Sequence, residues 1–242
     1  MAQNIYDHPE FFEGYSRLAR SQHGLDGAPE WPAIRALLPD LAGKRVVDLG
    51  CGFGWFARFA RTQGAAHALG LDLSANMIAR AKADTNDVGI TYEIADLEQL
   101  VLPQAAFGFA YSSLALHYIV DFARLVRVVH SALTPGAHFV FTIEHPIYMA
   151  SSHPVWSTDQ GGRKIWPVNR YAIEGARVTD WLAKGVVKQH RMLGTTLNAL
   201  IEAGFRLHHV QEWSPTAKQV ADNPDLADEL ERPMMVLIKA ER

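Results

Sequence analysis

The glycine-rich segment at residues 46–54, VVDLGCGFG, constrains the fold of this 242-residue chain more than any other feature. It places three glycines between an apolar run typical of a strand and a stretch typical of a helix. Glycine allows a sharp backbone turn and a close approach to a ligand. Short apolar runs alternate with helical stretches from residue 44 to residue 96. This alternation predicts βαβ units, a parallel sheet and a loop that binds a nucleotide-like cofactor.

Further elements are expected on both sides of this region. Two helices, at residues 9–20 and 30–38, precede the sheet, and a helix at 121–133 separates strands at 107–112 and 137–143. Residues 147–189 lose the alternation and are expected to form an insertion with little regular structure. A helix at 190–203 and strands at 205–213 and 234–239 complete the chain. We expect a single domain over residues 1–242.

Composition excludes several classes of protein. The formal net charge is -3, and the basic residues are scattered, so no electrostatic footprint for nucleic acid is expected. Cys51 is the only cysteine, which excludes an intrachain disulfide and favours a reducing, cytoplasmic location. The longest apolar stretch, residues 107–120, is shorter than the ~20 residues that span a bilayer. The spacing of His, Asp and Glu predicts no metal site, and the sequence does not indicate the oligomeric state.

The nature of the cofactor is indicated by three positions around the glycines. Asp72 ends the next predicted strand, where a carboxylate can accept hydrogen bonds from both ribose hydroxyls. A dinucleotide fingerprint needs Gly or Ala three residues after Gly52, but that position is Trp55. Asp48 precedes the loop, where its charge would repel a pyrophosphate but suits a cationic ligand such as S-adenosylmethionine (SAM).

With these residues, the chain resembles the class I SAM-dependent methyltransferases, in the small-molecule branch near the ubiquinone and menaquinone methyltransferase-like group. VVDLGCGFG resembles the first family motif, LDLS the second, IADLEQL the third, FAYSSLALHY the fourth, and LTPGAHFVFTIEHP the segment of the fifth strand. The ordered motifs cover roughly residues 44–144. The chain departs from the family at Gly108, usually Asp, and at Thr134, usually basic. The resemblance implies a Rossmann-like, seven-stranded, mostly parallel sheet with helices on both faces.

The resemblance also implies which residues contact SAM. The methionine part would lie on the loop and Asp48, the ribose on Asp72, and the adenine beside Leu73, Met77, Asp96 and Leu97. The N-terminal residues 1–40 would form a helical lid, in which Arg20 could pair with the cofactor carboxylate; a surface arginine is the alternative. The cofactor-binding residues predicted in this way are Tyr15, Arg20, Asp48, Gly50, Cys51, Gly52, Asp72, Leu73, Met77, Asp96, Leu97 and Ser112.

The acceptor is expected at the ends of the fourth and fifth strands. His117 and His145 follow those strands, and a histidine can orient or deprotonate a nucleophile. Each could instead be a hydrogen-bonded structural histidine, and His190 is expected to be a surface or lid residue. The insertion at 147–189 is rich in Trp and Tyr, which would cover the acceptor site or form a satellite core.

Several functions therefore stay open at this point. The first is methyl transfer from SAM to a small molecule through an O, N or C nucleophile. The second is a SAM-binding module without turnover, and the third is a nicotinamide-dependent oxidoreductase, which Trp55 disfavours. The sequence has no Pro-Cys pair, so covalent attack on a pyrimidine base is not expected. It also has no Asp/Asn-Pro-Pro-aromatic segment, which would hold a planar exocyclic amine for methylation. The acidic charge balance counters a nucleic-acid methyltransferase.

Overall fold

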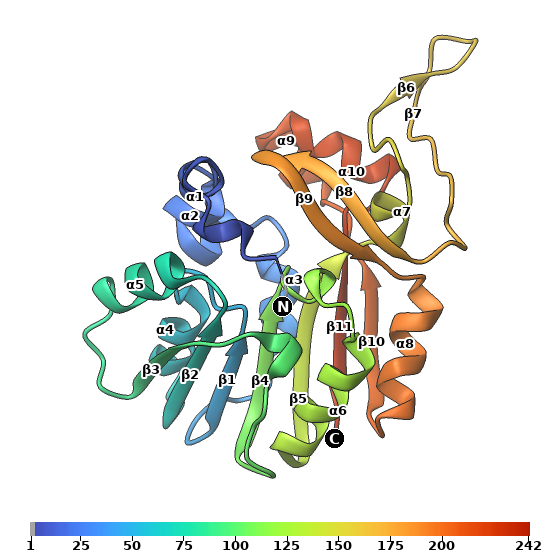
Figure 1. Ribbon diagram of the computed structural model, residues 1–242. Coiled ribbons are helices and arrows are strands. Elements are labelled where there is room, and N and C mark those ends of the chain that lie inside the picture. The colour runs from blue at the N-terminus through green and yellow to red at the C-terminus, as the bar shows by residue number, and fades with distance from the viewer. Residues whose placement is uncertain (1–2) are drawn as a thin grey trace.

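The computed structural model describes residues 3–242 and is built around a seven-stranded sheet (Figure 1). The strands lie in the order β10-β11-β5-β4-β1-β2-β3. Neighbouring strands from β5 to β3 are parallel, while β11 pairs antiparallel with both β5 and β10. The predicted Rossmann-like, mostly parallel sheet is confirmed. Its strands are β1 Arg45–Leu49, β2 His67–Asp72, β3 Ile90–Ile94, β4 Phe107–Ser113, β5 Leu133–Glu144, β10 Arg206–Glu212 and β11 Met235–Glu241.

Helices cover both faces of the sheet because successive side chains of its central strands are buried on opposite sides. On β1, Val46 packs with the helices of one face, whereas Val47 belongs to the cluster on the other. The first face carries α3 Trp31–Leu37, α4 Trp55–Thr62 and α5 Ala75–Ala83, and the second carries α6 Phe122–Ala132 and α8 Leu193–Glu202.

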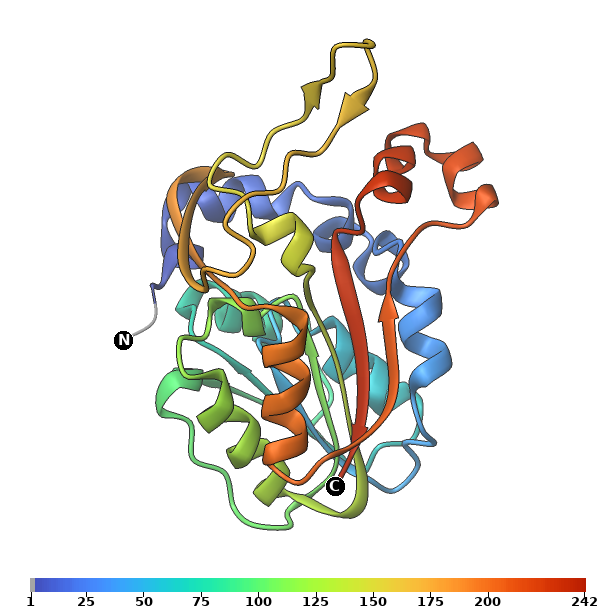
Figure 2. The same ribbon diagram turned by 90° about the vertical axis from the view of Figure 1, so that its right-hand side faces the viewer.

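The N-terminal segment and one hairpin lie at the same end of the sheet, opposite the C-terminus (Figure 2). The predicted helix at residues 9–20 is two shorter helices, because Leu18 between them is extended, with ψ 146°. This bend brings Arg20 to Glu30. The N-terminal segment consists of η1 Ile5–Asp7, α1 Pro9–Ser16, α2 Ala19–Gln22 and η2 Gly24–Gly27.

The expectation of little regular structure at residues 147–189 is wrong for its second half. There β8 Gly175–Trp181 and β9 Ala183–His190 form an antiparallel hairpin. The first half holds α7 Pro146–Met149 and a two-residue ladder between β6 Ser157–Thr158 and β7 Lys164–Ile165, which extends away from the body (Figure 1). Short helices that were not predicted separate β10 from β11: α9 Ala217–Asp222, η5 Pro224–Ala227 and α10 Asp228–Glu231.

Candidate active site

A cavity of about 430 Å³ lies at the carboxyl ends of the parallel strands. Residues that follow or end four strands line it, including Gly50 after β1, Leu73 after β2, Ser113 in β4 and Glu144 in β5. Ligands of open α/β sheets bind at this edge. The cavity is also lined by Tyr6 and Tyr15 of the N-terminal segment and by Trp181 of the hairpin, all aromatic.

The glycine loop forms one wall of the cavity and requires glycine for steric reasons. Gly50 has φ +77°, and a Cβ there would lie 2.3 Å from Cβ of Ala115. Gly52 has φ +52°, and the nearest atom to a Cβ built on it is Oη of Tyr15 at 3.9 Å. The backbone at Gly52 therefore leaves room that a side chain would fill, as expected for a loop that contacts a ligand closely.

Three carboxylates border the cavity with unequal hydrogen bonding. Asp72 is held by two backbone N–H donors, from Gly52 to Oδ2 and from Ser74 to Oδ1, each at 2.9 Å. Asp48 and Asp96 each keep one buried carboxylate oxygen without a hydrogen-bond partner among the described residues. Burial and the nearby Asp72 raise the pKa of Asp48 well above its usual range. Buried acceptors without donors are costly, so both positions fit a ligand that supplies N–H groups.

Apolar side chains complete this side of the cavity. Leu73, Met77 and Leu97 line it beside Asp96, and Met77 is only 1% exposed. Cys51 also lines it, and burial raises the pKa of its thiol well above the usual range. The thiol is therefore protonated and acts as a small apolar surface.

Known proteins with the same architecture settle the family. A crystal structure of a SAM-dependent methyltransferase from Mesorhizobium loti is 62% identical in sequence, with a TM-score of 0.88 over 90% of this chain and 100% of that one. The chain belongs to the SAM-dependent methyltransferases. The "Methyltransferase domain" family model matches residues 47–141 of this methyltransferase. The cofactor is therefore SAM, and the nicotinamide alternative is set aside.

Other relatives of the methyltransferase are more distant. An uncharacterized protein of Haemophilus influenzae is 31% identical over 99% of this chain and 97% of its own length. A malonyl-[acyl-carrier protein] O-methyltransferase of Erwinia billingiae is 35% identical over 53% of this chain and 49% of its own length. These similarities support methyl transfer but leave the acceptor of this methyltransferase open.

Tyr15 and Arg20, predicted on the cofactor, both line the cavity. The Arg20 guanidinium donates to both carboxylate oxygens of Glu30, at 3.0 and 3.2 Å. Glu30 is fully buried and needs this counter-charge. A cofactor carboxylate would therefore have to use the remaining N–H groups of Arg20, and that pairing stays a prediction.

Two predicted site residues, Ser112 and His145, do not reach the cavity. Ser112 is fully buried on the other face of β4, where its hydroxyl donates to the Leu49 carbonyl at 2.6 Å. Nε2 of His145 lies 2.7 Å from Glu212, and its Nδ1 accepts from the backbone N–H of Ile147 as the cap of α7. Both ring nitrogens of His145 are thus engaged in structural contacts, and neither Ser112 nor His145 lines the cavity, so the structure adds no support to their predicted roles in cofactor binding and catalysis.

His117 is the predicted catalytic residue that does line the cavity, and it is 4% exposed. Burial, followed by the positive charges of Lys188 and Arg191, holds its pKa well below the usual value. The backbone N–H of Glu144 points to Nδ1 at 3.4 Å. This bond places the proton of the neutral ring on Nε2, so His117 presents a hydrogen-bond donor.

Beside His117 the structure places an ion pair that was not predicted. Lys188 of β9 donates to Oε1 of Glu144 at 2.5 Å, and its side chain is 3% exposed. Oε2 of Glu144 is buried without a hydrogen-bond partner among residues 3–242. Glu144 lies at the end of the fifth strand, where the sequence predicts the acceptor site. Lys188 comes from a hairpin that was expected to be irregular.

His190, expected at the surface or in a lid, is fully buried, and its Nε2 lies 2.8 Å from the Tyr171 carbonyl oxygen.

Residues 3–7 bridge two sides of the cavity. The carboxylate of Asp7 accepts from the backbone N–H groups of Ala75 and Asn76, at 3.1 and 3.0 Å, and from the hydroxyl of Ser74. Gln3 pairs with β9, donating to the Gly185 carbonyl and accepting from the Val187 N–H, each at 2.9 Å. Residues 3–7, here termed the strap, thus connect the start of α5 to the β8–β9 hairpin.

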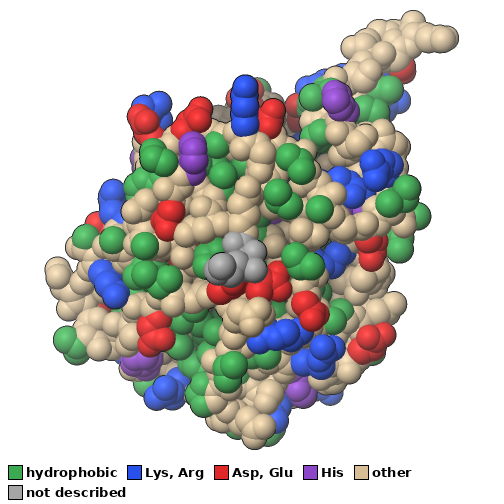
Figure 3. All heavy atoms as spheres, viewed as in Figure 1, with side chains coloured by type: hydrophobic (Ala, Val, Ile, Leu, Met, Phe, Trp, Pro, Cys, Tyr) green, Lys and Arg blue, Asp and Glu red, His purple; other side chains and the backbone are tan. Residues whose placement is uncertain are grey.

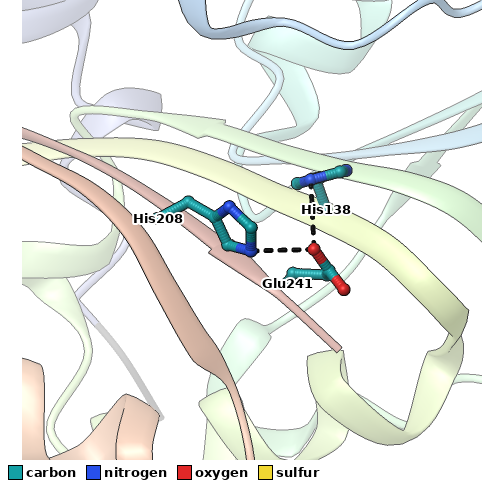
Figure 4. A group of neighbouring side chains, drawn as sticks. All are labelled: His138, His208 and Glu241. Carbon is teal, nitrogen blue, oxygen red and sulfur yellow. Dashed lines mark ion pairs between the residues drawn. The ribbon is translucent and has the colours of Figure 1, made fainter.

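A histidine cluster was not foreseen because its members lie on three strands. His138, His208 and Glu241 bring ligand atoms within 4.8 Å of one another (Figure 4). Arg206 also contacts this group, at 2.6 Å from Glu241 and 3.2 Å from His208. His138 is six residues before Glu144 on β5, roughly 20 Å away at the usual strand rise. The four side chains form an ion-pair network remote from the cavity.

The charged surface side chains of residues 3–242 do not mark a second binding site on the face shown in Figure 3. On the face shown in Figure 3, basic and acidic side chains are interspersed. Within residues 3–242, no helix is long and apolar enough to cross a bilayer.

Proposed function

We propose that this methyltransferase transfers the methyl group of SAM to a small-molecule acceptor held in the cavity. The unpartnered buried oxygens of Asp48 and Asp96 are the observation that carries this proposal, because SAM supplies an amino group at each end. Asp48 would face the methionine amino group, and Asp96 the adenine amino group between Leu73, Met77 and Leu97. Asp72 would accept from the ribose hydroxyls through its remaining lone pairs.

The chain's own residues would contribute chiefly position and desolvation. SAM supplies an electrophilic methyl group, and in-line transfer gains most from holding donor and nucleophile in contact. His117 would help to position the acceptor from beside Glu144, since its Nε2 lies 3.9 Å from Oε1 of that carboxylate. Residues 1–40 and 147–189 would act as a lid and as a cover over the acceptor, since Tyr6, Tyr15 and Trp181 line the cavity.

A screen of metabolites for acceptor-dependent formation of S-adenosylhomocysteine (SAH) tests this proposal. We expect SAH to accumulate only when an acceptor is added, and to be matched by methylated product in mass spectrometry. Tight SAM binding without turnover for any compound that fits the cavity would instead favour a SAM-binding module without activity.

The strap yields a prediction about the lid. Asp7→Ala removes three hydrogen bonds to the start of α5, and we expect the dissociation constant of SAM to rise by about two- to twelvefold, since a net hydrogen bond contributes about 0.5–1.5 kcal/mol. Calorimetric titration measures this, with Asp26→Ala as the control because Asp26 is an exposed carboxylate of the same segment. Equal affinities in both variants and the parent protein would remove the strap from the account.

A further inference from the structure

We infer, on the basis of the proposed function, that the acceptor is an amine that enters the cavity as its ammonium form and gives its proton to Glu144. Three features of the cavity favour an ammonium: the excess of carboxylates in its wall, the unpartnered carboxylate oxygen of Glu144, and the aromatic side chains that line it.

The cavity wall carries more carboxylates than basic side chains. Five carboxylates line it, against Arg20 as the only Lys or Arg among the described residues, and Arg20 is already paired with Glu30. Lys188, which does not line the cavity, reduces the excess of negative charge by pairing with Glu144. SAM carries one net positive charge, which leaves the wall acidic. An anionic acceptor would enter against this charge, whereas an ammonium is favoured. The five carboxylates are Glu30, Asp48, Asp72, Asp96 and Glu144.

Glu144 is the one carboxylate at the acceptor side. It ends β5 and lines the cavity with His117, Tyr118 and Tyr148. The aspartates lie at the other strands: Asp48 in β1, Asp72 at the end of β2, and Asp96 after β3. Its Oε1 is bonded to Lys188, and its Oε2 is buried without a partner in the described part of the chain. An ammonium would supply the missing donor. Tyr118 and Tyr148 also line the cavity, and the faces of such rings attract a cation.

The proton balance of the reaction follows from this arrangement. The ammonium transfers one proton to the Glu144 carboxylate, which frees the nitrogen lone pair. The nitrogen then forms a bond to the methyl carbon of SAM while the carbon–sulfur bond breaks, and that electron pair stays on sulfur as the thioether of SAH. The positive charge passes from sulfonium to the methylated ammonium. The protonated Glu144 returns its proton to solvent when the products leave.

The pKa of Glu144 agrees with this role. Burial raises it above the usual value, although the charge of Lys188 and its hydrogen bond oppose the rise. A carboxylate with a raised pKa is a better base at neutral pH. His117 does not compete for the proton, because burial holds its pKa well below the usual value.

The test compares acceptors that differ in charge but little in shape. Phenethylamine, phenethyl alcohol and phenylacetate, together with aliphatic sets of the same three classes, are incubated with the full-length protein and SAM, and SAH is measured. We expect turnover with amines and none with the carboxylates. The inference is overturned if a carboxylate is methylated. It is also overturned if none of the amines that fit the cavity is methylated. If SAM itself does not bind, the proposed function fails, so the two failures are distinguishable by calorimetry.

Variants then test Glu144 itself. For the amine that turns over, E144Q should lower kcat/KM by about tenfold or more while the dissociation constant of SAM stays within about twofold. Because E144Q leaves Lys188 buried and unpaired, the double variant E144Q/K188M restores the charge balance and should show the same loss. E212Q is the matched control, since Glu212 pairs with His145 outside the cavity and is 56% exposed. Parent-like kcat/KM in the folded double variant overturns the role of Glu144.

Discussion

Replacing Asp72 with alanine is expected to raise the dissociation constant of SAM by roughly 10- to 150-fold, the scale of 1.5–3 kcal/mol for hydrogen bonds to a charged group. The carboxylate has two tasks that alanine abolishes. It accepts from the N–H of Gly52 and so fixes the glycine loop, and it is the group positioned to accept from the ribose. Isothermal titration with SAM and SAH measures the change.

Two controls separate these tasks. Asp84→Ala removes a carboxylate just after α5 that pairs with Arg80, and it should bind SAM like the parent protein. Asp72→Asn keeps the size of the side chain but turns one acceptor into a donor, so its affinity should fall between those of Asp72→Ala and the parent. If Asp72→Ala binds SAM with parental affinity, the ribose is held elsewhere.

Replacing His117 with alanine is expected to lower kcat by roughly 10- to 150-fold with little change in SAM affinity, because His117 lines the cavity beside Glu144 and a misplacement of the acceptor by about 1 Å can cost about 100-fold in rate. The structure favours donation over proton abstraction, since Nδ1 faces the backbone N–H of Glu144. His117→Gln can still donate from its amide, so it should lose less activity than His117→Ala. Single-turnover measurements with a confirmed acceptor report the chemical step directly.

The pH dependence provides an independent check. His117 has a pKa held below the ordinary 6.5, so its ring stays neutral as the pH falls from neutrality through that value. Protonation of His117 should therefore cause no fall in kcat/KM as the pH is lowered through 6.5. An acid limb at 6.5 that disappears in His117→Gln would show that the histidine titrates normally and acts as a base. Parental kcat in both variants would make His117 structural.

Much of the fold could be predicted because the strands follow simple patterns. β1 and β2 are buried on both faces and are largely apolar runs, and Gly50 marks the turn between β1 and α4. The β8–β9 hairpin was missed for a physical reason. On β9 the buried positions include Lys188 and His190, so the alternation of buried and exposed side chains is not an alternation of apolar and polar residues.

The candidate site likewise contains residues that local sequence places and residues whose position depends on distant partners. Residues on the loops after β1, β2 and β3 line the cavity, because local sequence fixes those loops, and their contacts with SAM stay a prediction. Ser112 does not line the cavity because side chains alternate along β4, so its neighbours Tyr111 and Ser113 line it instead. His145 and Arg20 are constrained by Glu212 and Glu30, which are 67 and 10 residues away in the chain. Partners at such separations leave no local signal.

A crystal structure of the protein with SAH tests the central claim most directly. The account predicts the ribose hydroxyls on Asp72, the methionine amino group near Asp48, the adenine amino group near Asp96, and the sulfur facing the space between His117 and Glu144. SAH bound with its sulfur turned away from these two residues, or bound outside the cavity, would contradict it.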